Sequence, residues 1–118
     1  MIKYEDLNEE QKEFLTDGCG NYFLNVPDLE FGEACRHHDF GYWLGHTKED
    51  RADVDWSWYV MMVDAASKYG WWKRTSLKWA AWIYYKAVRM VSGRFFYYGD
   101  DYKTFEDLDK EMAEATQS

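Results

Sequence analysis

The ten residues "ACRHHDFGYW", numbered 34–43, decide how the fold of this chain is interpreted. Two of the chain's three histidines stand side by side in this stretch. Four of its side chains follow the i, i+3, i+4 and i+7 spacing of a single helix face: Cys35, His38, Asp39 and Tyr42. We therefore predict a helix over residues 31–43. A His-Asp pair alone is more often an ordinary solvated surface, so its meaning depends on the segments before and after it.

The segments on either side of this helix each contribute an acid. Upstream, "TDGCG" opens a loop predicted over residues 17–30, which is long for a connection in a compact domain and therefore a candidate functional loop. Downstream, Thr47 or Asp50 can cap a third helix that runs to about Ser67. Asp53 lies in this helix beside an apolar stripe, which favours a buried carboxylate. The stripe consists of Ala52, Trp56, Tyr59, Val63 and Ala66.

Such a set of residues suits hydrolysis by an activated water. A loop acid and a helix acid can hold a hard cation such as calcium, with backbone carbonyls and water completing its shell. A histidine can act as a general base near neutral pH, and a second, buried acid can orient its ring. A zinc site is disfavoured, because the cysteines and histidines do not follow a usual zinc spacing.

The rest of the chain also has the pattern of helices, and we expect one all-α domain spanning residues 1–118. Asp6 and Glu9 stand at capping-box spacing before a short first helix. A fourth helix is predicted over residues 72–92, and a last one follows Thr104. The strand signal is weak throughout, with "RFFYY" as the one candidate.

Charge is distributed unevenly along the chain, whose formal net charge is −8. An acidic balance argues against general nucleic-acid binding, which needs an excess of Lys and Arg. Residues 65–99 nevertheless contain seven bases and no acid, whereas residues 1–64 and the tail at 100–118 are acidic. No apolar run approaches the ~20 residues that span a bilayer. The N-terminus also lacks the apolar core of a signal peptide.

Three motifs, in this order and spacing, resemble the phospholipase A2 superfamily: "DGC" at 17–19, "ACRHHDFGY" at 34–42 and "RADVDWSWYVMM" at 51–62. The chain is most similar to the short helical phospholipases A2 of bacteria and fungi, in which a T-D-x-C loop precedes an A-C-x-x-H-D-F-G-Y helix and an R-x-D helix follows. The similarity covers about residues 15–93. It implies an all-α fold with two antiparallel catalytic helices and a calcium-binding loop, together with an N-terminal helix and further C-terminal helices.

The resemblance implies a hydrolytic role for the polar face of the second helix. His38 would be the general base that activates water against the sn-2 ester of a glycerophospholipid, which releases a fatty acid and a lysophospholipid. Asp53 would hydrogen-bond the His38 ring, and Tyr42 would support that acid. These three residues form the expected catalytic group.

The resemblance also implies a calcium ion, held by the carboxylates of Asp39 and Asp17 and by the backbone carbonyl of Gly18. Calcium would bind the substrate phosphate and the developing oxyanion. Cys19 and Cys35 match a disulfide bridge between the calcium loop and the catalytic helix, worth ~3 kcal/mol for a loop of about 16 residues in the chain-entropy model. Bacterial members usually have a second disulfide and a signal peptide. Neither is visible in this sequence, which leaves the redox state of the two cysteines open.

The basic segment at residues 65–99 also holds 11 of the 24 aromatic residues and has two interpretations. Trp and Tyr combined with Lys and Arg suit a membrane interface, but a core helix whose rings pack beneath neighbouring loops would have the same composition. In a chain with a lipid-ester site we expect the interface, formed by a monomer that contacts a phospholipid surface peripherally. The expected contact residues are Trp71, Trp72, Lys73, Arg74, Trp79 and Trp82.

Two alternatives to a calcium-dependent phospholipase A2 remain open at this point. A non-enzymatic member of the same fold, for example of phage or viral origin, would bind lipid or calcium or serve a structural role without turnover. The retention of every expected catalytic position argues against it. A metal phosphohydrolase also begins from a His-Asp pair, but it needs a further histidine upstream, and none precedes His37.

Overall fold

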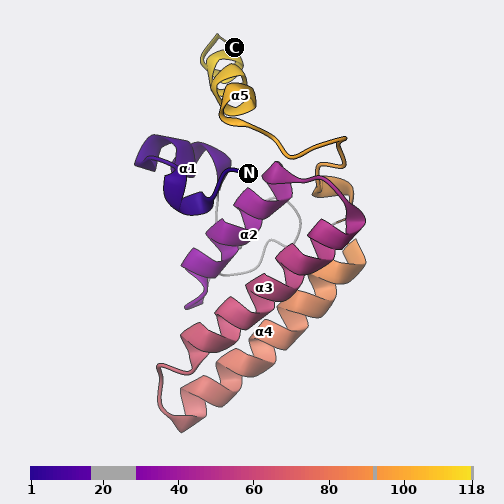
Figure 1. The fold of residues 1–118 in the computed structure, drawn as a ribbon. Helices are drawn as coiled ribbons and strands as arrows, with labels where there is room; N and C mark the ends of the chain where they lie inside the picture. Colours follow the sequence, from indigo (N-terminus) through magenta and orange to yellow (C-terminus); the bar gives the residue numbers. More distant parts are fainter. Residues whose placement is uncertain (17–28, 92, 118) are drawn as a thin grey trace.

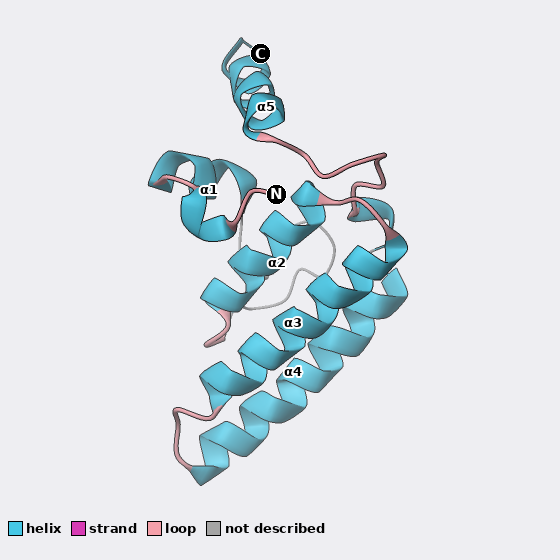
Figure 2. Ribbon diagram, in the orientation of Figure 1, coloured by secondary structure: helices cyan, strands magenta, loops and turns pink. Residues whose placement is uncertain are grey.

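The computed structural model describes residues 1–16, 29–91 and 93–117, and this part of the chain contains helices and no strand (Figure 1, Figure 2). The elements, in order, are the 3-10 helix η1 (Tyr4–Asp6), α1 (Glu9–Leu15), α2 (Gly32–Leu44), α3 (Lys48–Ala66), α4 (Trp71–Val91), the 3-10 helix η2 (Gly93–Phe95) and α5 (Phe105–Gln117). The expected all-α class is confirmed, and "RFFYY" forms no strand. The loop that contains Asp17, Gly18 and Cys19 lies outside the described residues.

Helices α3 and α5 begin at threonines whose side chains satisfy the first unpaired amides. Thr47 caps α3: Asp50 N donates to Thr47 Oγ1 over 3.0 Å, and Thr47 N donates back to Asp50 Oδ2 over 3.1 Å. Thr104 and Asp107 form the same reciprocal pair at the start of α5. Both starts follow the prediction from the sequence.

The start of α1 differs from the prediction. Asn8 is its N-cap, and Asn8 Oδ1 accepts from Gln11 N over 2.8 Å while Gln11 Oε1 accepts from Asn8 N over 2.9 Å. Asp6 belongs instead to the preceding turn η1, where its carboxylate accepts from Lys3 N over 3.0 Å. Asn caps a helix as well as Asp does, and the Gln at N3 completes the box.

Helices α3 and α4 lie side by side as an antiparallel hairpin, and α2 packs against α3 (Figure 1). The main core lies between these helices and consists of Phe31, Ala34, Cys35, Tyr42, Trp58, Met62, Ala66, Leu77, Ala81, Tyr84, Val88 and Phe96. Gly41 permits the close approach of α2 to α3, because a Cβ at this position would lie 2.6 Å from Cγ1 of Val54. The approach places His38, about one turn before Gly41, against α3.

The C-terminal segment folds back on α2. A strap at residues 96–103 passes the end of this helix, where Tyr97 N donates to Tyr42 O over 3.2 Å and His46 N donates to Tyr97 O over 2.8 Å. Helix α5 then buries Leu108 completely in a second core. This core contains Ile2, Tyr4, Leu7, Leu15, Phe40, Leu44 and Leu108. The tail therefore helps to hold the helix that contains His38.

Candidate active site

His38 on α2 and Asp55 on α3 form a buried, hydrogen-bonded pair. The distance from His38 Nε2 to Asp55 Oδ1 is 2.7 Å, and the two residues are 3% and 0% exposed. An ionised carboxylate can only accept, so Nε2 holds the proton of the neutral ring and donates it to Asp55. The lone pair of the ring is then on Nδ1, which is the nitrogen able to accept a proton.

The Asp55 carboxylate is held by side chains from α2, α3 and α4. Tyr42 OH donates to Oδ1 over 2.7 Å, and Arg89 Nη1 donates to Oδ2 over 2.7 Å. Arg51 Nε lies 3.9 Å from Oδ2 and donates to Tyr42 OH over 3.1 Å. A fully buried charge is costly unless it has such partners, so these contacts fix both the charge and the orientation of Asp55.

Aromatic rings hold the imidazole of His38 in place. The ring centroids of Tyr42 and Trp58 each lie 4.4 Å from the centroid of His38. Trp58 is buried, and its Nε1 donates to the sulfur of Cys35 over 3.4 Å. The four side chains predicted to share one face of α2, which include Cys35 and Asp39, are all buried.

The prediction that Asp53 binds the His38 ring is wrong, because the carboxylate at that position belongs to Asp55. Asp53 is exposed at the rim of a pocket. The buried residues of α3 are Asp55, Trp58, Met62 and Ala66. The sequence misled the prediction because Trp56 of the predicted apolar stripe is 52% exposed, and Ala66 is the one stripe residue that is buried. Hydrophobic periodicity also treats every acid as an exposed position, so it cannot reveal a carboxylate that is buried.

Two arginines of the site were missed from the sequence. Arg51 precedes Asp55 by four residues, a spacing that brings side chains together on a helix and was therefore a usable signal. Arg89 is 34 residues beyond Asp55, and no local pattern connects them. Their contact depends on how α4 packs against α3, which periodicity does not define.

The environment sets the charge states of the pair. Burial lowers the pKa of His38, and the hydrogen bond to Asp55 opposes this effect only in part. For Asp55, burial would raise the pKa, but the hydrogen bonds from His38, Tyr42 and Arg89 outweigh it, so the pKa falls below its ordinary value. At neutral pH the pair is therefore a neutral imidazole beside an ionised carboxylate, the state that a general base requires.

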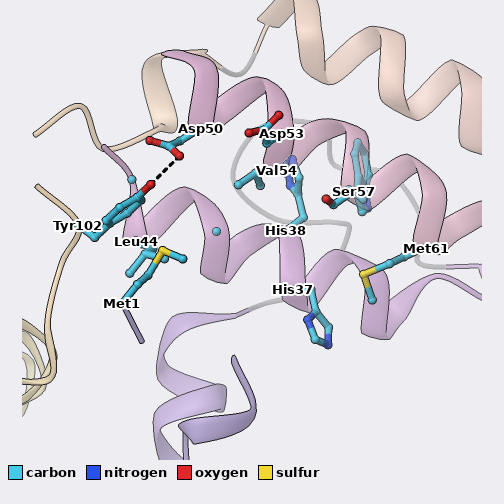
Figure 3. Close-up of a pocket in the computed structure, with 13 residues that line it drawn as sticks. Met1, His37, His38, Leu44, Asp50, Asp53, Val54, Ser57, Met61 and Tyr102 are labelled. Carbon is cyan, nitrogen blue, oxygen red and sulfur yellow. Dashed lines mark hydrogen bonds between the residues drawn. The ribbon is translucent and has the colours of Figure 1, made fainter. Parts of the chain in front are cut away.

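A pocket of about 370 Å³ lies along the groove between α2 and α3. Figure 3 shows His38 extending from α2 toward α3, with Val54 and Met61 in the same lining. Tyr102 of the C-terminal strap lines the pocket as well, and its hydroxyl donates to Asp50 Oδ1 over 2.7 Å. A largely apolar pocket beside a buried base can accommodate an apolar substrate chain.

Asp39, the predicted calcium ligand, is buried on α2 and lines a second pocket of about 410 Å³ that Glu111 also lines. Its predicted co-ligands, Asp17 and Gly18, lie outside the described residues. Within residues 1–16, 29–91 and 93–117, no group of three or more His, Cys, Asp or Glu could hold a metal ion. Calcium binds carboxylate and backbone oxygens. Two of the ligands that the resemblance implies, the Asp17 carboxylate and the Gly18 carbonyl, belong to the loop outside the described residues.

The residues predicted to meet a membrane all lie on α4, and most are exposed. Trp72 and Trp79 are 78% and 66% exposed. Trp82 is partly held by the fold, because its ring packs 5.7 Å from that of Tyr59 across the seam with α3. Lys73 forms an ion pair of 3.0 Å with Glu30. None of the described helices is long and apolar enough to cross a membrane.

Comparison with known families identifies the family of this chain. A model of the prokaryotic phospholipase A2 family matches residues 2–92, so the chain belongs to that family. The match includes α1 and extends further toward the N-terminus than the predicted 15–93, while α5 lies beyond it. Searches of curated proteins and of solved structures gave no match. Membership supports phospholipase A2 activity in general for this all-α chain.

Proposed function

We propose that the protein is a calcium-dependent phospholipase A2 that hydrolyses the sn-2 ester of glycerophospholipids with a water activated by His38. The family match supports the activity class. The observation that supports the mechanism best is the buried pair of His38 and Asp55, 2.7 Å apart. A neutral imidazole fixed by an ionised acid is the arrangement that general-base hydrolysis needs.

In this proposal, His38 Nδ1 takes a proton from a water molecule as the water oxygen bonds to the ester carbonyl carbon. The protonated ring then gives that proton to the leaving oxygen as the ester C–O bond breaks, so that a fatty acid and a lysophospholipid form. Asp55 stabilises the transient positive charge of the ring, the role first assigned to Asp53, and Tyr42 holds Asp55. The hydrogen-bonding groups of Asp55 and Tyr42 are already oriented before the reaction, which reduces the reorganisation needed in the transition state.

A calcium ion suits the chemistry of Asp39, since a carboxylate is a hard oxygen donor and this one is buried directly after the base. We propose Asp39, Asp17 and the Gly18 carbonyl as its ligands. When bound, calcium would supply a positive charge for the substrate phosphate and the ester oxygen. We also propose that Cys19 is bridged to the buried Cys35, although Cys19 lies outside the described residues.

The proposed route to the substrate is a peripheral contact of α4 with an anionic lipid surface. This helix contains no acid, so its exposed tryptophans are accompanied only by positive charge. Indole rings prefer the headgroup level of a bilayer, and cations meet anionic lipid there. Trp71, Trp72 and Trp79 are the principal proposed contacts, whereas Lys73 already has Glu30 as a partner.

The test is release of labelled fatty acid from vesicles of sn-2-labelled phospholipid, with calcium or with a chelator. We expect the wild type to release fatty acid with calcium and not with chelator. The rate should fall by about 10²- to 10⁴-fold in His38→Gln. Asp39→Asn should lose both calcium affinity and activity. His46→Asn is the matched control, because the ring of His46 contacts the backbone oxygen of Gly99 at 3.0 Å rather than Asp55. Vesicle binding without release by the wild type would contradict the proposal and favour a lipid-binding protein.

A further inference from the structure

Arg89 is the contact between α4 and the His38–Asp55 pair. Its Nη1 donates to Asp55 Oδ2 over 2.7 Å, while His38 and Tyr42 use Oδ1. The two oxygens of one carboxylate thus bind different helices: Oδ1 faces α2, and Oδ2 faces α4. Because a carboxylate is planar, holding Oδ2 from one side also fixes the direction in which Oδ1 meets the imidazole.

The end of α4 is itself fixed against α3. Arg51 Nη2 donates to the backbone oxygens of Val88 and Arg89, over 3.2 Å and 3.3 Å. Val88 is fully buried in the main core. Arginine near a helix C-terminus stabilises the last carbonyls, so the backbone from which Arg89 extends has a defined position.

Arg89 could instead serve as one more surface cation on a basic helix. Its geometry is that of an inward contact, because only 34% of its side chain is exposed and its guanidinium reaches a fully buried acid. Lys86, three residues earlier, shows the other arrangement. It is exposed, and its Nζ lies 4.9 Å from the ring centroid of Trp82. The two residues have the same charge but different surroundings, which makes them a matched pair.

We propose that Arg89 is a positioning residue for the reaction. It holds Asp55 so that Oδ1 orients the His38 ring, and it thereby connects the catalytic pair to the helix that faces lipid. This inference rests on the proposed function for its catalytic meaning. Its structural part concerns the orientation of the His38 ring and has a separate readout.

The kinetic test compares Arg89→Gln, Arg89→Lys and Lys86→Gln on anionic vesicles, with kcat, KM and vesicle affinity measured for each. We expect kcat to fall about 10- to 100-fold in Arg89→Gln, the usual cost of removing a group that orients a primary site residue. Arg89→Lys should restore part of that loss, because it restores a positive donor near Oδ2. Lys86→Gln should leave kcat unchanged. If Arg89→Gln leaves kcat unchanged, with or without a loss of vesicle affinity, the proposal is overturned.

The structural test observes the His38 Nε2 proton by NMR in ¹⁵N-labelled protein. We expect a downfield, slowly exchanging resonance that moves in Arg89→Gln and stays in place in Lys86→Gln. Asp55 keeps Tyr42 and Arg51 as partners in the variant, and thermal unfolding checks that it folds. An unmoved resonance overturns the positioning role. An absence of hydrolysis by the wild type overturns the proposed function instead, so the two failures are distinguishable.

Discussion

The inner side of the α3–α4 hairpin buries a charged residue, whereas its outer side exposes large aromatic rings. On the inner side, Asp55 is fully buried, and its carboxylate meets both His38 and Arg89 at 2.7 Å. On the outer side, large rings such as Trp72 and Trp79 are left exposed on a helix without an acid. One buried charge within an apolar core and a group of exposed large rings are both departures from the usual distribution of residues.

The difference indicates that the two sides do separate work. A buried charge persists only where its partners are built around it, which is typical of a chemical site. An exposed group of large rings is typical of a contact surface. Substitutions on the inner side should therefore change turnover, and substitutions on the outer side should change binding to lipid.

The two acids of α3 provide the strongest contrast, because Asp53 and Asp55 are two residues apart and Asp53 is exposed while Asp55 is fully buried. Asp55→Asn should lower kcat by about 10²- to 10⁴-fold, since an amide both removes the charge and can present the wrong hydrogen-bonding atom to His38. Asp53→Asn should leave kcat near that of the wild type, because Asp53 is exposed. Vesicle hydrolysis with both variants measures the effect. A large loss in Asp53→Asn alone would restore the assignment made from the sequence.

The outer side is tested by removing two exposed rings together. Trp72→Ala/Trp79→Ala should weaken binding to anionic vesicles by about 10- to 100-fold, because each indole would bury apolar area at the interface. Turnover at saturating vesicle concentration should change little. The control is Phe105→Ala, which removes an exposed ring from the acidic tail. Equal losses of vesicle affinity in the double variant and in the control would show that α4 is not the docking surface.

The smallest expected effect is on stability in acid. The pKa of Asp55 is lower in the native state than its ordinary value of 3.8. As the pH falls below about 4, the unfolded chain therefore takes up this proton before the native state does, and the stability due to Asp55 is lost down to its native pKa. The groups facing Asp55 are His38, Tyr42, Arg51 and Arg89.

Thermal unfolding between pH 5 and pH 3, in buffer with chelator, measures this effect. The melting temperature of the wild type should fall more steeply with decreasing pH than that of Asp55→Asn, whose side chain does not titrate. Parallel curves would mean that the native contacts of Asp55 do not lower its pKa.

Much of the fold could be predicted because its signals are local. Thr47 precedes its helix by one residue, and Thr104 stands in the same relation to α5. Helix α4, predicted over residues 72–92, spans Trp71–Val91, and its buried residues Leu77, Ala81, Tyr84 and Val88 follow the spacing of one helix face.

The site could be predicted only in part. The face of α2 with His38 and Tyr42 follows from helical periodicity, which depends on the chain itself. The choice between Asp53 and Asp55 could not be made in this way, because α3 has large apolar side chains both inside and outside the core. The calcium ligands and the disulfide remain predictions, since Asp17, Gly18 and Cys19 lie outside the described residues.

The sequence by itself determined the helices, the polar face of α2 and the family, since each depends on residues close together or on motifs in a set order. Tertiary structure decided which acid holds His38, and it brought in Arg89 from α4. Those contacts form because α2, α3 and α4 pack together around Asp55. A buried carboxylate must be surrounded by donors. Burial of charge depends on the assembled neighbours, so it leaves no regular pattern along a single helix.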